Sequence, residues 1–384
     1  MDSMCCTNDE NGAGSHLSAG REAMSEARTD LPLLAITLGD PSGVGPEIVL
    51  KALDHQGLHR RCRALVIGDR RTLTRAMGWP GVPSLAIEAV RSLDLAGPGG
   101  GSAGGSAGGS AGECYGPGML TLLDLRNADP AACPVGEVSA ASGRAAVEYV
   151  QRACDLCIQG VAAAMVTAPL NKDAMNQAGF AYAGHTELLT ERTGAGKVTM
   201  LLAGPKLRVV HVSTHVALEE AIRRVTTERV SEVIELAYQG CRALGIGAPR
   251  VAVAGLNPHA GERGLFGDQE AREIVPAVEA ARARGLDVSD PQPPDTVFLR
   301  ASQGAYDIVV AMYHDQGHIP MKLLAFDEGV NVSLGLPIIR TSVDHGTAFD
   351  IAGTGVARET SLLAAIDVAL QMVAARQNTA PARV

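Results

Sequence analysis

Short apolar runs alternate with longer amphipathic stretches along most of the chain. The short runs are apolar almost throughout, as buried parallel strands are, rather than alternating with polar residues. Predicted strands lie at 31–37, 64–68, 162–168, 198–204, 207–213, 251–256 and 308–313, and the clearest predicted helices at 143–160, 230–245 and 269–285. Strands of this kind separated by helices predict an α/β fold with a mainly parallel sheet that helices cover on both faces.

Two stretches lack these patterns. Residues 1–31 are polar and small, without sustained periodicity, which predicts a disordered N-terminal extension. Residues 97–112 form a tract of glycine, serine and alanine that cannot bury an apolar face, which predicts a flexible surface loop. Strand and helix patterns continue on both sides of this tract, so we interpret it as an insertion within a domain.

Composition and charge narrow the class of protein. The chain has 384 residues, of which 46% are hydrophobic, and a formal net charge of −9, which disfavours nucleic acid as a partner. No apolar run approaches the roughly 18 residues needed to span a bilayer, and the N-terminus lacks the order of a signal peptide. The eight cysteines are scattered, as free thiols in a reducing compartment are. We expect a cytoplasmic protein with a small-molecule ligand.

The pair Cys154 and Cys157 has the spacing of a redox motif. The two cysteines lie inside the predicted helix at 143–160, however, and not at a turn between a strand and a helix. The pattern therefore favours structural cysteines over redox or metal chemistry.

Three histidines each follow a predicted strand, and they are candidate metal ligands. His215 follows LRVVHVST, His259 follows RVAVAGLNP, and His314 follows YDIVVAMY. A single histidine at a strand end is usually a surface residue or satisfies a local hydrogen bond. Parallel strands present their carboxyl ends at one edge of the sheet, so three histidines delivered there favour a shared metal site. An enzyme is the leading interpretation.

The first ordered strand runs into a glycine-rich turn, Gly39-Asp40-Pro41-Ser42-Gly43-Val44-Gly45-Pro46-Glu47. Backbone amides at the start of the following helix could face a ligand, and a purely structural turn is the alternative. The spacing matches neither the dinucleotide nor the phosphate-loop fingerprint.

Together with a second motif near the C-terminus, this turn resembles the isopropylmalate and isocitrate dehydrogenase fold. The second motif is DHGTAFDIAGTG, at 344–355. The resemblance implies two lobes with the active site in the cleft between them. It also implies that the second motif holds the adenosine part of a nicotinamide cofactor, through His345, Gly346, Thr347, Ala348 and Asp350.

A narrower resemblance covers residues 33 to 375, apart from the insertion. Seven motifs stand in the order and spacing of the 4-hydroxythreonine-4-phosphate dehydrogenase family, which includes a branch acting on 4-phospho-D-threonate or its erythronate isomer. The motifs are GDPSGVGPEIVLKAL, VTAPLNKDAM, GHTELLTERTG, STHVAL, LNPHAGE, MYHDQGHIPMK and VNVSLGLPIIRTSVDHGTAFDIAGTG.

This resemblance assigns roles to individual residues. It implies that His215, His259 and His314 bind one divalent metal ion. It places His185, Thr186, Lys322, Asn331 and Arg340 at substrate-binding positions, with catalytic roles for Lys322 and His185. Lys322 and Arg340 supply positive charge for a carboxylate and a phosphate, and only arginine can make a paired contact. Thr186 has a structural alternative, which is to cap the helix that begins at ELLTERTG.

The implied reaction is an NAD-dependent oxidation of the 3-hydroxyl of a 4-phosphorylated hydroxy acid, followed by decarboxylation. A divalent ion suits both steps because it stabilises negative charge on oxygen as the hydride and then carbon dioxide leave. The two substrate branches differ mainly in carrying an amino or a hydroxyl group at carbon 2. A metabolite-binding protein without activity, and a metal-dependent acyl or phosphoryl transferase, are the alternatives from other classes.

The resemblance also implies an organisation and an assembly. We expect one lobe from 32–165 plus 336–384 and a second from 166–335, which carries the metal and substrate groups and the dimer contacts. The family's active site draws on both subunits of a homodimer. Three histidines suit zinc first, and cobalt, nickel, manganese or magnesium are compatible alternatives.

Overall fold

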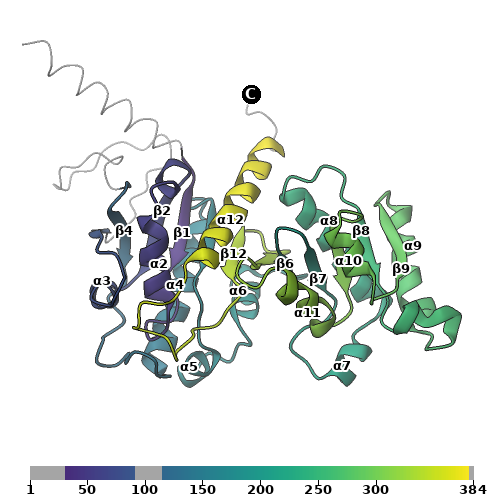
Figure 1. Cartoon of the computed structure of the whole chain (residues 1–384), viewed down its shortest axis with the longest axis horizontal. Coiled ribbons are helices and arrows are strands. Elements are labelled where there is room, and N and C mark those ends of the chain that lie inside the picture. The colour runs from purple at the N-terminus through teal and green to yellow at the C-terminus, as the bar shows by residue number, and fades with distance from the viewer. Residues whose placement is uncertain (1–30, 91–114, 380–384) are drawn as a thin grey trace, which may run out of the picture.

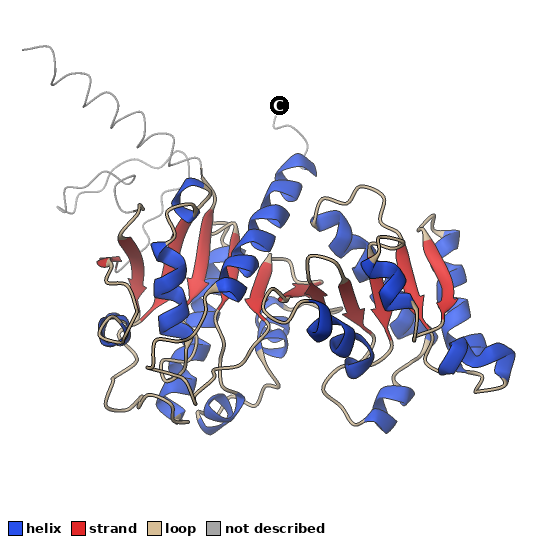
Figure 2. Cartoon of the chain, in the orientation of Figure 1, coloured by secondary structure: helices blue, strands red, loops and turns tan. Residues whose placement is uncertain are grey.

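The computed structural model describes residues 31–90 and 115–379. The predicted extension, apart from Leu31, and the predicted insertion at 97–112 lie outside the described residues. Within those ranges the chain forms an α/β structure in which helices lie on both faces of one sheet (Figures 1 and 2). The predicted fold class is confirmed.

Among the described residues the sheet has twelve strands, in the order β3-β4-β2-β1-β5-β12-β11-β6-β7-β10-β8-β9. The strands are β1 (Leu33–Thr37), β2 (Arg63–Gly68), β3 (Ala86–Val90), β4 (Met119–Asp124), β5 (Ala164–Thr167), β6 (Thr199–Ala203), β7 (Arg208–His211), β8 (Val251–Ala254), β9 (Val288–Gln292), β10 (Ile308–Ala311), β11 (Val330–Leu334) and β12 (Arg340–Val343).

All neighbouring strands are parallel except at the centre of the sheet. There β11 runs antiparallel to both β12 and β6, and β6 runs antiparallel to β7. One half of the sheet comes from residues 33–167 with β12, and the other half from residues 199–334. The two halves therefore belong to one continuous sheet in the part of the chain that the structure describes. The exact lobe boundaries stay a prediction.

Helices connect the strands. They are α2 (Gly45–Asp54), α3 (Arg70–Ala76), α4 (Ala140–Ile158), α5 (Lys172–Gln177), α6 (His185–Thr193), α7 (Leu218–Arg223), α8 (Thr227–Ala243), α9 (Val275–Ala283), α10 (Val297–Ser302), α11 (His314–Leu324) and α12 (Thr360–Thr379). A 3-10 turn at Leu58–Arg60, a turn at Pro258–Gly264 and a π-helical turn at Glu270–Ile274 complete the described structure.

The core explains why the apolar runs form these strands. Strands β1, β5, β8 and β10 are buried along their entire length, because helices cover both of their faces. No helix in the described ranges is long and apolar enough to cross a membrane.

Cys154 and Cys157 are free thiols on the same helix. Cys154 is buried on α4, and burial raises the pKa of its thiol to about 11. Cys157, on the same helix, is partly buried, and burial raises the pKa of its thiol to about 12. Neither thiol ionises readily at neutral pH, so neither has the thiolate character that redox chemistry requires.

Candidate active site

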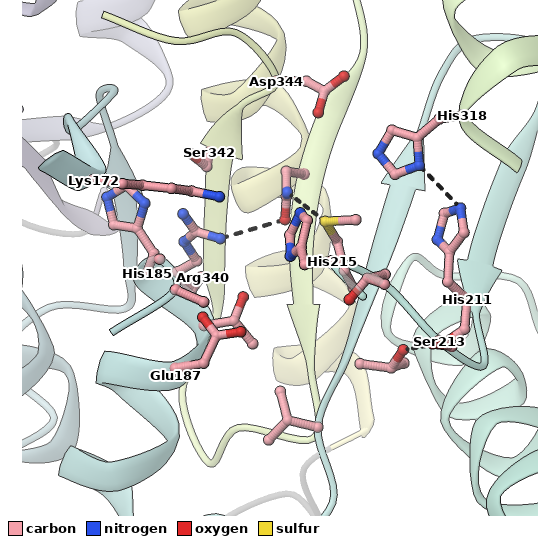
Figure 3. A pocket seen from close by; sticks show the side chains of 18 of the residues that line it. Lys172, His185, Glu187, His211, Ser213, His215, His318, Arg340, Ser342 and Asp344 are labelled. Carbon is pink, nitrogen blue, oxygen red and sulfur yellow. Dashed lines mark hydrogen bonds between the residues drawn. The ribbon is translucent and has the colours of Figure 1, made fainter. Parts of the chain in front are cut away.

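A cavity of about 780 Å³ lies over the centre of the sheet. Its walls come from the segments at the start of α5 and α6, from the start of β6, and from the end of β7 with the loop that follows it. The segment from the end of α7 into α8, the helix α11, and β11 and β12 with the loop after β12 complete them. Figure 3 shows the side chains that converge on it. The segments that form it are far apart in the sequence.

The floor of the cavity is a polar patch produced by strand alternation. In the antiparallel pair β11 and β12, Asn331 lies opposite Ser342. Side chains alternate between the two faces of a strand, so Ser333 and Arg340 share the face of Asn331 and Ser342. Thr341 points to the other face, where its hydroxyl donates to the backbone oxygen of Ala365 on α12 at 2.8 Å. The cavity and α12 therefore lie on opposite faces of the sheet.

Arg340 is 2% exposed. Its Nη2 donates to Thr167 Oγ1 at 2.8 Å, and its Nη1 donates to Ser333 Oγ at 3.1 Å and to Asn331 Oδ1 at 3.4 Å. Burial lowers the pKa of the guanidinium to about 9. Its charge forms no ion pair with a carboxylate within the described ranges, although a buried charge is costly without an anionic partner.

His185 lies next to this arginine. The buried Nε2 of its ring has no hydrogen-bond partner among the described residues. Burial, followed by the charges of Arg340 and Lys172, lowers the pKa of the ring well below its usual value. The imidazole is therefore neutral at physiological pH, and one of its nitrogens is available to bind a ligand.

Thr186 also lines the cavity, but it does not cap the helix. Helix α6 begins at His185, two residues earlier than the sequence predicted, and its N-cap residue is Gly184, which has no side chain to bond the helix start. The structural alternative in which Thr186 caps this helix is wrong, because Thr186 lies within the first turn.

The predicted metal ligands are divided between two places. The rings of His215 and His314 lie 5.6 Å apart, centre to centre. Two imidazoles that bind one tetrahedral ion at about 2.1 Å have ring centres roughly 5 Å apart, so this pair fits a shared ion. His314 Nδ1 lies 2.6 Å from Asp315 Oδ1, which leaves Nε2 available for a metal.

His259 lies elsewhere in the described chain. It is the second residue of the turn at Pro258–Gly264, where His259, Ala260, Glu262 and Arg263 all have left-handed backbone angles. Its side chain is 59% exposed, with Nδ1 3.3 Å from Glu262 Oε2, and it does not line the cavity. Within residues 31–90 and 115–379, no three His, Cys, Asp or Glu side chains gather closely enough to hold a metal ion.

Two further histidines, neither of which directly follows a predicted strand, pack beside His314. The His318 ring stacks on the His314 ring, with centres 3.6 Å apart. His211 Nε2 lies 3.2 Å from His318 Nδ1, and burial lowers the pKa of His211 to about 3 and that of His318 to about 4. Gly317 permits this contact, because a Cβ there would come within 2.4 Å of His211 Nε2. The signal in the sequence for this cluster is His211, a polar residue inside the otherwise apolar predicted strand at 207–213.

Lys322 is not part of the cavity wall. Its ammonium forms an ion pair with the carboxylate of Asp344 and donates to the backbone oxygen of Asp344 at 3.0 Å. Asp344, not Lys322, lines the cavity. Lys172, at the start of α5, does line the cavity, and its charge contributes to lowering the pKa of His185.

The predicted cofactor loop is only partly exposed to the cavity. His345 and Gly346 line it, Thr347 is buried, and Ala348 and Asp350 lie farther along the loop. The glycine-rich turn supports this loop rather than a ligand, since Val44 N donates to Thr347 O at 3.0 Å. A Cβ at Gly43 would come within 2.8 Å of the same oxygen. The structure therefore favours the structural alternative for the turn.

Comparison with known proteins decides the family. The model of the family "Pyridoxal phosphate biosynthetic protein PdxA" matches residues 60–369. The chain belongs to the PdxA family.

Individual relatives are similar over nearly their whole length. The chain is 48% identical to a D-threonate 4-phosphate dehydrogenase of Cupriavidus necator, across 88% of this chain and 96% of that protein. It is 47% identical to a 4-hydroxythreonine-4-phosphate dehydrogenase of Desulfosudis oleivorans, across 89% of this chain and 96% of that protein. The crystal structure of a 4-hydroxythreonine-4-phosphate dehydrogenase from Klebsiella pneumoniae is 42% identical in sequence and has a TM-score of 0.77. That match covers 89% of this chain and 99% of the crystallised chain.

The membership confirms the resemblance drawn from the motifs. These PdxA relatives are dehydrogenases, which confirms the prediction of an oxidoreductase. Their names fall on both sides of the predicted alternative at carbon 2 of the substrate.

Proposed function

We propose that this PdxA protein oxidises the 3-hydroxyl of a 4-phosphorylated 3-hydroxy acid with NAD and then releases carbon dioxide. The observation that carries the proposal is Arg340, a buried guanidinium that faces the cavity without a carboxylate partner in the described chain. A substrate carboxylate would supply the missing anion, and an arginine can bind it through two parallel hydrogen bonds.

The proposed reaction has two steps, an oxidation at carbon 3 and a decarboxylation. The hydride on carbon 3 passes to the oxidised nicotinamide, and the hydroxyl proton is released, which leaves a 3-keto acid. The bond between carbons 1 and 2 then breaks, carbon dioxide leaves, and the electron pair stays on the remaining fragment, which takes up a proton at carbon 2. A divalent ion would stabilise the negative charge that develops on the oxygen of carbon 3.

The residues of the chain have separate tasks in this proposal. Arg340 and Asn331 hold the carboxylate on the floor of the cavity, and the neutral His185 donates a hydrogen bond from its unpaired nitrogen. Lys322 stays a predicted catalytic group, and its ion pair with Asp344 must open for it to reach the substrate. The loop from His345 to Asp350 would hold the adenosine of NAD, at the edge of the same cavity.

The proposed metal site needs a second copy of the chain. His215 and His314 provide two ligands, and His259 is exposed outside the cavity. We therefore propose a homodimer in which His259 of one copy completes the site of the other. Zinc suits three histidines first, and cobalt, nickel, manganese and magnesium are alternatives that metal analysis of the purified protein would distinguish. We place the enzyme in the cytoplasm.

The test is a parallel assay of NAD reduction, followed at the reduced-nicotinamide absorbance band. The substrates are 4-hydroxy-L-threonine 4-phosphate, 4-phospho-D-threonate and 4-phospho-D-erythronate. We expect reduction with at least one of them, and the preferred one identifies the group at carbon 2. D-threonate 4-phosphate is the alternative candidate beside the threonine derivative, because the Cupriavidus relative is a D-threonate 4-phosphate dehydrogenase. A protein that binds these phosphorylated compounds but reduces NAD with none of the three would contradict the proposal.

A further inference from the structure

Glu270 is a buried glutamate to which the proposed reaction gives no task. It is 5% exposed, and it begins the π-helical turn at Glu270–Ile274. Its Oε1 accepts hydrogen bonds from the backbone N–H groups of Leu256 at 2.8 Å and of Asn257 at 2.7 Å. Its Oε2 accepts a third from the side-chain nitrogen of Asn257 at 2.9 Å. Hydrogen bonds to a carboxylate are stronger than those between neutral groups, so this side chain fixes the backbone just after β8.

The backbone that Glu270 fixes leads directly into a left-handed turn. Five consecutive residues, 259–263, have φ angles between 42° and 80°. All of them except Gly261 carry a side chain, and such residues rarely adopt this conformation because Cβ comes too close to the following carbonyl oxygen. Backbone strain of this kind persists only where surrounding contacts hold it. The turn therefore needs support from outside itself.

Two glycines show how closely the turn packs on Glu270. A Cβ at Gly261, in the middle of the turn, would come within 2.8 Å of Glu270 Oε2. A Cβ at Gly255 would come within 2.7 Å of Ala260 Cα and 3.2 Å of Glu270 Oε1. The backbone oxygen of Asn257 also accepts a hydrogen bond from Ala260 N at 3.1 Å. The carboxylate, the segment after β8 and the left-handed turn thus form one closely packed unit.

We propose that Glu270 is a positioning residue, which holds the left-handed turn so that His259 reaches the metal site of the other copy of the chain. This inference rests on the proposed function, which assigns His259 to that site. His259 is the first residue of the turn with a left-handed backbone, and its side chain is 59% exposed. The direction of such an exposed ring depends on the backbone that carries it, and Glu270 fixes that backbone.

The first experiment measures the zinc affinity of the full-length protein by competition with a chelator, without NAD or substrate. Glu270→Ala should weaken zinc binding roughly ten- to a hundredfold, because a metal ligand loses the group that orients it. Glu270→Gln keeps an oxygen for the two backbone N–H groups, so it should lose about tenfold or less. Glu279→Ala is the matched control, since Glu279 is an exposed glutamate on α9, and it should bind zinc as the wild type does.

A second experiment separates positioning of His259 from a general loss of structure. Two variants with different affinity tags are produced together, and their mixed dimers are isolated through both tags. Glu270→Ala paired with His215→Ala should restore one site of two, because one copy supplies His215 and the other supplies an undisturbed His259. We expect about half of the wild-type zinc per dimer. Glu270→Ala paired with His259→Ala should restore no site, because neither copy presents His259 correctly.

Wild-type zinc affinity in both Glu270 variants would overturn the inference. A Glu270→Ala and His215→Ala dimer that restores no site would also overturn it, because Glu270 would then serve the structure of its own cavity. The Glu270→Gln protein takes the same place in the mixed dimers should the alanine variant fail to fold.

The inference and the proposed function fail in different ways. Zinc binding that depends on Glu270 and His259, in a protein that reduces no NAD, would contradict the proposed reaction and support the positioning role. Zinc binding that His259→Ala weakens and both Glu270 variants leave unchanged would contradict only the positioning role. Zinc affinity that His259→Ala leaves unchanged would contradict the proposed metal site and the positioning role together.

Discussion

At the scale of single residues, Asp40 shows how burial changes the pKa of a carboxyl group, an effect that the neighbouring residues in the sequence do not indicate. It follows β1 in the glycine-rich turn and is completely buried. Burial raises the pKa of its carboxyl group to about 6, although the backbone N–H of Ser42 donates a hydrogen bond to Oδ1 at 2.8 Å. The sequence places an aspartate in a turn, and only the packing around it makes the charged form unfavourable.

The raised pKa predicts a dependence of stability on pH. Because the folded state holds the proton more tightly, the contribution of Asp40 to stability is fully present below the unfolded pKa of 3.8 and is lost as pH rises through about 6. The loss at neutral pH is roughly 3 kcal/mol by linkage. Asp40→Asn should therefore stabilise the protein at neutral pH and change its stability little at acid pH.

Denaturant unfolding at about pH 4 and about pH 7.5 checks this prediction. Asp287→Asn, a change at an exposed position, is the control. A stability difference between Asp40→Asn and wild type that stays constant between the two pH values would show that burial does not govern this carboxyl group.

At the scale of elements, α2 holds the loop between β12 and α12 in place. Glu47 is fully buried, and its Oε1 accepts hydrogen bonds from Lys51 Nζ and from Ala357 N, each at 2.8 Å. Lys51 Nζ also donates to the backbone oxygens of Gly355 and Ala357 at 2.8 and 2.7 Å. The glycine-rich turn and the DHGTAFDIAGTG motif, which stand near opposite ends of the chain, thus form one structural unit.

A double-mutant cycle tests this connection. Lys51→Met leaves a buried carboxylate without its partner and should cost roughly 3 kcal/mol in the free energy of unfolding. The change Glu47→Met together with Lys51→Met should cost less than the sum of the two single changes, by about 1 to 3 kcal/mol. Urea denaturation gives all four values.

The exposed pair Arg61 and Asp367 is the matched control, with side chains that are 46% and 54% exposed. Solvent screens such a pair, so removing it should cost about 1 kcal/mol or less. Additive effects of the Glu47 and Lys51 changes would show that the buried pair does not couple the two motifs.

At the scale of the whole molecule, the proposed site is incomplete in one chain and large apolar side chains are exposed. On α11 and just after it, Leu323 is 81% exposed and Phe326 is 73% exposed. Leu265 and Phe266, close to His259 in sequence, are 72% and 46% exposed. Exposed apolar groups on this scale are typical of a surface that another protein covers, which supports the proposed homodimer.

Complementation between two inactive variants tests the shared site. His215→Ala and His259→Ala should each abolish activity and weaken metal binding, because each removes one proposed ligand. Mixed dimers contain one site with both histidines, so mixing the variants after reversible dissociation should restore about a quarter of the wild-type activity. Mixing His215→Ala with His314→Ala is the control, since both residues belong to the same cavity wall and no site is restored.

Activity that stays absent in the first mixture, although mixed dimers form, would show that His259 does not act across the dimer. Light scattering after size exclusion establishes the dimers. The metal content of the mixed dimer gives a readout that does not depend on turnover.

The sequence by itself determined the family and seven of the twelve strands that the described residues form, but not β3, β4, β9, β11 and β12. Continuous apolar runs predicted the buried strands, because parallel strands covered on both faces need apolar residues at every position. The motif order identified the PdxA relatives, and the comparisons confirmed it. The strand-end positions of His215 and His314 also predicted that the two side chains lie close together, since β7 and β10 are parallel neighbours.

Only the tertiary structure decided which side chains face one another. The family resemblance assigned Arg340 to the substrate, but its burial without an ion pair in the described chain depends on the register of β11 against β12. His215 and His259 each follow a strand and each have a left-handed backbone angle, yet His215 lines the cavity and His259 does not. Periodicity reports which face of an element is buried, whereas the direction of a loop and the charges around a cavity arise from contacts between distant segments.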